Sequence, residues 1–155
     1  MYLDTWTMIY RIVGALLFGG IVGYERETEQ KPAGLRTIML VTLGSALLML
    51  LAQRIPDLIQ VHVDTLTMDP TRILGSLVQG IGFLGAGTIF LHKSTVHGLT
   101  TAAAIWTMAV VGAAVGTGDW PLSIMGTVAA FFILRVLGPL SFRDTNKNQQ
   151  PATES

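Results

Sequence analysis

One stretch of the chain matches a nucleotide-binding pattern letter for letter. Residues 79–87 read QGIGFLGAG, so the segment from Gly80 to Gly85 is a G-x-G-x-x-G. In a dinucleotide-binding fold this pattern follows a strand, opens a helix and precedes an acidic residue by about 20 positions. Here the motif lies inside an uncharged apolar run, and residues 99–108 contain neither Asp nor Glu. The context therefore excludes a dinucleotide site.

Charged and hydroxyl side chains at the ends of the apolar runs are better candidates for a polar site. Glu25 and Arg26 lie where the first run ends, and Arg36 and Thr37 lie where the second begins. A helix C-terminus disfavours an anion and a helix N-terminus disfavours a cation. An ion pair between Glu25 and Arg36 would reconcile both charges with their helix ends. The alternative is that each side chain reaches water separately, because surface ion pairs are often weak.

Two threonines open the fourth apolar run, in the segment GLTTAA at residues 98–103. Thr100 and Thr101 are expected to satisfy free amides at the start of that helix. The alternative is that this polar helix end completes the site with Glu25 and Arg36.

The third run is preceded by the segment DPTR at residues 69–72. An Asp at the N-cap followed by Pro at the first helical position is an ordinary helix start. The alternative gives Asp69 and Arg72 a role in ion binding at the outer face of the membrane.

The remaining reactive residue types do not indicate an enzyme. His92 and His97 are five positions apart without a nearby carboxylate or cysteine, which is a poor metal signature, so no metal site is expected. No Ser/His/Asp triad is suggested, and the chain has no cysteine. The formal net charge is zero, which gives no indication of nucleic-acid binding. We expect no catalytic activity and no cofactor.

The elements that must position these residues are long apolar segments. Half of the 155 residues are hydrophobic and 13% are charged, whereas soluble domains carry roughly 25% charged residues. A bilayer-spanning helix needs about 20 mostly apolar residues. The windows that approach this length are Trp6–Tyr24, Thr37–Ala52, Ile73–Leu91, Leu99–Thr117 and Trp120–Leu137. The sequence predicts an all-α membrane protein with about five transmembrane helices.

The distribution of Lys and Arg predicts the orientation. Arg26, Lys31, Arg36 and Lys93 fall on one side together with the C-terminal residues. The side richer in Lys and Arg is cytoplasmic, so the N-terminus is expected outside and the C-terminus in the cytoplasm. Arg11 interrupts the first run and is expected to snorkel outward.

The chain is expected to form a single transmembrane domain over residues 1–140. Residues 1–4 carry no positive charge and no cleavage site follows the first run, so that run is read as a permanent span. Residues 141–155, SFRDTNKNQQPATES, are polar and lack apolar periodicity. They are predicted to be a disordered polar tail.

Small residues recur four positions apart, and each set lies on one helix stripe. The sets are Ala15, Gly19 and Gly23; Ser76 and Gly80; Gly82 and Ala86; Gly112 and Gly116. Small residues let membrane helices approach closely, so the first, third and fourth helices are expected to pack at short range, within one subunit or in a homodimer. Gly82, Gly85 and Gly87 leave two alternatives: a crowded central helix, or a helix kinked or broken around a site.

Five sequence blocks, taken in order, resemble the MgtC/SapB family of bacterial membrane proteins. They are GYERE at 23–27, AGLRT at 33–37, DPTR at 69–72, GIGFLGAG at 80–87 and GLTTAAAIW at 98–106. The matching positions are Gly23, Glu25, Arg26, Gly34, Arg36, Thr37, Asp69, Arg72, Gly82, Phe83, Gly85, Gly87, Gly98, Thr100, Thr101 and Trp106.

The resemblance implies a small multi-pass protein of the bacterial inner membrane, linked to magnesium limitation, acid stress and survival in host cells. It implies a regulator that contacts another membrane complex, with the F-type ATP synthase as a possible partner. Many family members continue into a cytoplasmic regulatory domain, which this chain lacks before Ser155. Two hypotheses follow. The protein regulates another membrane protein or ion homeostasis through helix contacts, or it transports an ion or small solute through a polar site at its cytoplasmic half.

Overall fold

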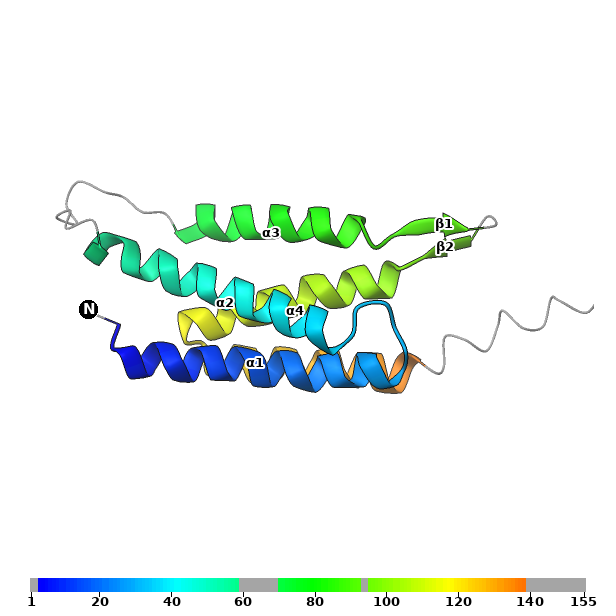
Figure 1. Cartoon of the computed structure of the whole chain (residues 1–155), viewed down its shortest axis with the longest axis horizontal. Helices are drawn as coiled ribbons and strands as arrows, with labels where there is room; N and C mark the ends of the chain where they lie inside the picture. Colours follow the sequence, from blue (N-terminus) through cyan, green and yellow to red (C-terminus); the bar gives the residue numbers. More distant parts are fainter. Residues whose placement is uncertain (1–2, 59–69, 93–94, 139–155) are drawn as a thin grey trace, which may run out of the picture.

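The computed structural model describes residues 3–58, 70–92 and 95–138 as a bundle of antiparallel helices (Figure 1). The elements are α1 (Thr5–Thr28), α2 (Leu35–Leu58), α3 (Pro70–Ala86), β1 (Phe90–His92), β2 (Thr95–His97), α4 (Leu99–Thr117), α5 (Trp120–Phe132) and the π-helical turn η1 (Ile133–Leu137). The connection from α1 to α2, the β1–β2 hairpin and the start of α4 lie at one end of the bundle, which we call the hairpin end (Figure 1).

Four helices have the length and apolar composition to cross a membrane: Thr5–Thr28, Leu35–Pro56, Leu99–Thr117 and the continuous Trp120–Leu137. An 18-residue helix is about 27 Å long, close to the hydrocarbon core of about 30 Å. The chain is therefore a multi-pass, all-α membrane protein, as its apolar runs predicted. α3 is a shorter apolar helix, so the structure supports four full-length spans and one short helix.

The third helix ends earlier than the sequence predicted. We expected it to reach Leu91, but α3 ends at Ala86. The three glycines Gly82, Gly85 and Gly87 weaken the helix in this region. The Thr88 hydroxyl then donates to the Gly85 carbonyl at 2.7 Å, which satisfies one of the last carbonyls of α3. The helix is continuous from Gly82 to Ala86, so the alternative of a helix broken around a site is not formed there.

A short hairpin, which the sequence analysis did not predict, joins α3 to α4. Its two strands pair antiparallel, with Phe90 opposite His97 and His92 opposite Thr95. Gly98 then starts α4 with a φ of +90°, a conformation that side-chain-bearing residues rarely adopt. A Cβ at this position would also overlap the carbonyl oxygen of Thr88. Gly98 is therefore required by the tight return from hairpin to helix.

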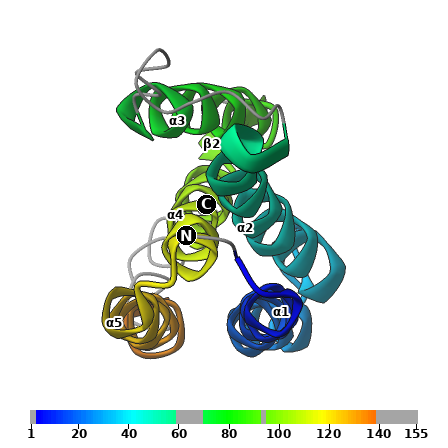
Figure 2. The ribbon, with the colours of Figure 1, turned by 90° about the vertical axis from the view of Figure 1, so that its left-hand side faces the viewer.

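The central element of the bundle is α4, which contacts all four other α-helices. In the end-on view α4 lies in the middle, with α1 and α5 on one side and α3 on the opposite side (Figure 2). Its side chains Ile105, Met108 and Val115 are almost fully buried. The prediction that α3 is a crowded central helix is wrong, because α3 packs mainly against α4, makes fewer contacts with α2 and lies at the edge of the bundle (Figure 2).

The glycines of α4 permit a very close approach to α2. A Cβ on Gly112 would collide with the backbone of Thr42, and one on Gly116 would lie 2.6 Å from the Ala46 carbonyl oxygen. In α1, a Cβ on Gly19 would lie 2.9 Å from Thr42 Oγ1. These contacts confirm the predicted short-range packing for α1 and α4.

Candidate functional site

A buried polar contact links the end of α1 to the start of α4 at the hairpin end. Arg26 Nη2 donates a hydrogen bond to Thr101 Oγ1 at 2.7 Å. The exposed fractions are only 3% for Arg26 and 4% for Thr101. A buried guanidinium is costly unless it is paired and hydrogen-bonded. The bond to Thr101 therefore favours the arrangement in which the end of α1 lies against the start of α4.

Glu25 supplies the opposite charge in the same cluster. It is 6% exposed and precedes Arg26 on the last turn of α1. Glu25 Oε2 and Arg26 Nε have no hydrogen-bond partner among the described residues. Buried polar atoms are satisfied in most folded proteins. The cluster of Glu25, Arg26 and Thr101 therefore keeps one acceptor and one donor available for a water molecule or a ligand.

The ion pair between Glu25 and Arg36, one of the two alternatives, is not formed, and the other alternative, separate exposure to water, holds for Arg36 but not for the buried Glu25. Arg36 and Thr37 are exposed. The start of α2 is instead satisfied by Glu27, whose Oε2 accepts a hydrogen bond from the Leu35 amide at 2.9 Å. A carboxylate is favourable at a helix N-terminus, and Glu27 supplies it at the start of α2.

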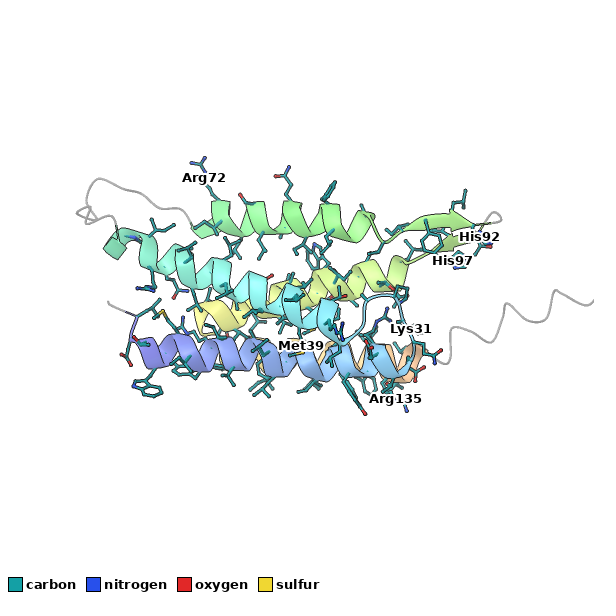
Figure 3. The ribbon with its side chains drawn as sticks, in the orientation of Figure 1. Lys31, Met39, Arg72, His92, His97 and Arg135 are labelled. Atoms are coloured by element: carbon teal, nitrogen blue, oxygen red, sulfur yellow. The ribbon has the colours of Figure 1, made fainter. Side chains whose placement is uncertain are left out.

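Arg36 and Thr37 contribute to a second polar feature at the hairpin end. They line an open surface depression together with Glu27, Gln30, Lys31, Pro32 and Gly34. Nearby, Arg135 of η1 forms an ion pair with Glu29 at 3.2 Å (Figure 3 labels Arg135). Their positions at neighbouring run ends predicted one site for Glu25, Arg26, Arg36 and Thr37. In the structure, Glu25 and Arg26 belong to the buried cluster, and Arg36 and Thr37 line the exposed depression.

The start of α4 also differs from the expectation of threonine capping. Its N-cap is Gly98, and no side chain makes a capping hydrogen bond there. Thr100 is exposed, whereas Thr101 accepts the bond from Arg26. The alternative placed this helix end in a site with Glu25 and Arg36, whereas the residue that bonds to Thr101 is Arg26, and Arg36 is exposed.

A second arginine of α1 contacts the other end of α4. Arg11 Nη1 donates to the Gly116 carbonyl at 2.8 Å and to Gln53 Oε1 at 3.1 Å, and Gln53 Nε2 donates to the same carbonyl at 2.8 Å. A cation is favourable at a helix C-terminus. The prediction that Arg11 snorkels outward is therefore wrong. Sequence reasoning missed Gln53, whose signal is a single amide at the end of a long apolar run.

The predicted glycine motif lies on a helix with an open side. We define the outer face of α3 by six of its exposed residues: Gly75, Ser76, Gln79, Gly80, Gly82 and Phe83. Phe83 is 85% exposed, and no described atom lies within 4 Å of a Cβ built on Gly75, Gly80 or Gly82. Arg72, at the start of the helix, points away from the bundle (Figure 3).

The other motif residues have separate positions. Gly85 faces Ala102 of α4, with 3.6 Å between a built Cβ and the alanine Cβ. Gly87 follows the end of α3. Trp106, 45% exposed, lines a small apolar crevice between α3 and α4. Asp69 lies outside the described residues, so its proposed ion-binding role stays a prediction.

A family model and individual relatives of the chain indicate the same protein family. The model of the MgtC family matches residues 12–142. The chain is 40% identical over 145 residues to "Putative magnesium transporter YhiD" of Escherichia coli K12, covering 93% of this chain and 66% of that protein. It is 37% identical over 129 residues to "Protein MgtC" of Brucella abortus, covering 83% of this chain and 50% of that protein.

A third relative is "Protein SrpB" of Synechococcus elongatus, which is 37% identical over 143 residues, covering 86% of this chain and 75% of that protein. No solved structure matches the chain. The chain thus spans about two thirds of the length of the YhiD protein and half of the length of the Brucella protein.

Proposed function

This chain belongs to the MgtC family, and we propose that it serves magnesium homeostasis by contacting another membrane protein through the outer face of α3. The magnesium assignment rests on the name of the YhiD relative. The proposed location is the bacterial inner membrane. The contact is regulatory, so the protein changes the activity of its partner and catalyses no reaction itself.

The outer face of α3 is the observation that carries this proposal. Membrane helices associate where small residues allow their backbones to approach. Gly75 and Gly82 lie seven positions apart, on one side of the helix, and no described residue packs against either. Phe83 beside them offers a large apolar side chain, 85% exposed. A partner helix could approach the backbone closely at Gly75 and Gly82 and pack its side chains against Phe83.

The packed interior supports the regulatory proposal over transport. α4 occupies the middle of the bundle, and its side chains Met108 and Val115 are fully buried. Two buried hydroxyls on neighbouring helices bond to their own helices: Thr42 donates to the Ile38 carbonyl and Thr127 to the Ser123 carbonyl, both at 2.8 Å. These side chains therefore offer no continuous polar path beside α4.

The partner in this proposal is a larger membrane complex, and the F-type ATP synthase is the first to test, because the family resemblance implies it. A homodimer through α3 is the competing assembly. Both arrangements need the same face, so a substitution there is expected to disrupt either one. Identification of the recovered protein separates them.

The test replaces Gly82 with Leu and compares it with Gly44→Leu. Gly44 of α2 is also exposed, with no described atom within 4 Å of a built Cβ, so it is a matched control on a different helix. Cross-linking in native membranes followed by affinity recovery should capture the partner with wild type and Gly44→Leu, and lose it with Gly82→Leu. Equal recovery from all three would contradict the proposal.

Transport is the second candidate, because Glu25 Oε2 and Arg26 Nε are buried without hydrogen-bond partners among the described residues. Under this alternative the cluster of Glu25, Arg26 and Thr101 binds the transported ion or solute. Purified protein in liposomes would then move Mg²⁺ or another solute faster than empty liposomes, and Glu25→Gln would abolish the difference. A flux equal to that of empty liposomes eliminates transport and leaves the contact proposal standing.

A further inference from the structure

We propose that His92 and His97 form a binding site for a divalent transition-metal ion such as Zn²⁺, Ni²⁺ or Cu²⁺ on one face of the β1–β2 hairpin. This site goes beyond the proposed function, since neither imidazole belongs to the buried cluster or to the outer face of α3. It also differs in chemistry from any site for Mg²⁺, which prefers oxygen ligands.

The register of the hairpin brings the two histidines together. Phe90 pairs with His97, and His92 pairs with Thr95. Side chains alternate between the two faces of a strand, so Phe90, His92, Thr95 and His97 share one face and Leu91 with Val96 share the other. His92 and His97 are diagonal neighbours across the strands, a relation that remains within reach of long side chains.

The rings are close enough to share one ion. Their centroids lie 6.4 Å apart, with an angle of 60° between the ring planes (Figure 3). A metal–nitrogen bond is about 2.0–2.1 Å long, which places the centre of each ligating ring roughly 3 Å from the ion. Two rings on one tetrahedral ion are therefore about 5 Å apart, so rotation of these exposed side chains has to bring the imidazole centroids roughly 1 Å closer together.

Phe90 prepares one of the ligands. Its ring stacks on His97, with centroids 5.5 Å apart and an angle of 19° between the planes. Such a contact restricts the rotation of His97 and lowers the conformational entropy lost on binding. Both histidines are exposed, so an ion can reach them from solvent and keep water molecules in its other coordination positions.

The donor set selects the class of ion. Imidazole nitrogen suits Zn²⁺, Ni²⁺ and Cu²⁺, and carboxylate or carbonyl oxygen suits Mg²⁺. Within residues 3–58, 70–92 and 95–138, no three His, Cys, Asp or Glu side chains gather as a metal site. The proposed site therefore has two protein ligands and is open. The spacing of five residues between His92 and His97 did not predict a metal site, because the two side chains come together only when the hairpin forms.

The test uses the full-length protein in detergent, with any histidine tag removed. Titration with Ni²⁺ followed by calorimetry should show one ion per chain, and the Cu²⁺ complex should give an electron paramagnetic resonance spectrum with coupling to two nitrogens. His92→Ala and His97→Ala should each lower the affinity about tenfold or more, since losing a ligand costs at least as much as losing its support. Size-exclusion profiles verify that the variants fold.

His62→Ala is the matched control, because His62 is the third histidine of the chain. It should bind Ni²⁺ as the wild type does, and millimolar Mg²⁺ should not displace the ion. Undiminished binding by the folded His92→Ala/His97→Ala double variant would overturn the proposal. So would a ratio of one ion per two chains, which would assign the ligands to a bridge between two molecules.

Discussion

The neighbouring helices α3 and α4 both carry small residues four positions apart, yet only α4 uses them within the bundle. Gly112 and Gly116 of α4 lie directly against the backbone of α2, whereas Gly80 and Gly82 of α3 face open space in the described residues. α4 contacts every other α-helix, and α3 lies at the periphery (Figure 2). A small-residue pattern thus indicates a capacity for close packing, and its surroundings determine whether that capacity is used.

The same two helices differ in polar anchoring. α4 is held near both ends by arginines of α1: Arg26 donates to the Thr101 hydroxyl, and Arg11 donates to the Gly116 carbonyl. Near the start of α3, by contrast, the Ser76 hydroxyl donates to the Arg72 carbonyl of the same helix at 3.0 Å. Two arginines of α1 thus hold α4, whereas the outer face of α3 is open among the described residues, as the proposed contact with a partner requires.

The largest effect should come from filling the closest contact of α4. Gly112→Ala places a Cβ against the Thr42 backbone, which cannot rotate away as a side chain could. Overpacking typically costs about 1–3 kcal/mol, and occasionally more, so we expect a loss of about 3 kcal/mol in the free energy of unfolding. Reversible unfolding in mixed micelles measures it. A loss below about 0.5 kcal/mol would show that α2 and α4 separate easily.

Removing the polar anchor near the start of α4 should have the next largest effect. Thr101→Val deletes the acceptor of the Arg26 bond while preserving the shape of the side chain. Hydrogen bonds to charged groups contribute about 1.5–3 kcal/mol, so the free energy of unfolding should fall by about 2 kcal/mol. Thr100→Val is the matched control, because Thr100 is the exposed neighbour. Equal losses for both variants would argue against a specific role of the Arg26 bond.

The anchor at the other end of α4 should tolerate substitution better. Arg11→Leu removes the bond from Arg11 Nη1 to the Gly116 carbonyl, but Gln53 Nε2 still donates to that carbonyl at 2.8 Å. We expect a loss of about 1 kcal/mol, less than the roughly 1.5–3 kcal/mol typical of a bond to a charged group, because the contact is only partly buried and the carbonyl keeps its bond from Gln53. The Arg11→Leu/Gln53→Leu double variant should lose more than the sum of the two single variants. Additive losses in the same unfolding assay would show that the two donors act independently.

The apolar runs predicted the long helices because run length alone distinguishes a membrane helix. They did not predict which charged residue faces inward, since Arg26 and Arg36 both lie at run ends and only the packing of α1 against α4 separates them. Arg11 was misassigned for the same reason: the Gly116 carbonyl that accepts its hydrogen bond lies 105 positions further along the chain. The hairpin was missed because its strands have three residues each, and short apolar runs do not distinguish helix from strand.

The same limit applies to the glycines. The glycines of the third run indicated that its helix could pack closely against another helix. They did not indicate which helix that would be. Gly85 contacts Ala102 across the α3–α4 interface, while Gly82 one turn earlier is open among the described residues. Sequence spacing places both on the same short helix, and only the position of α4 makes one an internal contact.

The smallest expected effect completes the comparison on α3 itself. Gly82→Ala adds a Cβ that meets no described atom within 4 Å, and alanine is favoured over glycine inside a helix by roughly 0.5–1 kcal/mol. The free energy of unfolding should therefore rise by about 0.5 kcal/mol, at the lower end of that range. Gly44→Ala, on the exposed side of α2, should give a similar gain. Destabilisation of the purified protein by Gly82→Ala but not by Gly44→Ala would show that α3 already packs against a second copy of the chain. In that assembly the small residues of α3 would make close helix contacts, as those of α4 do within one chain.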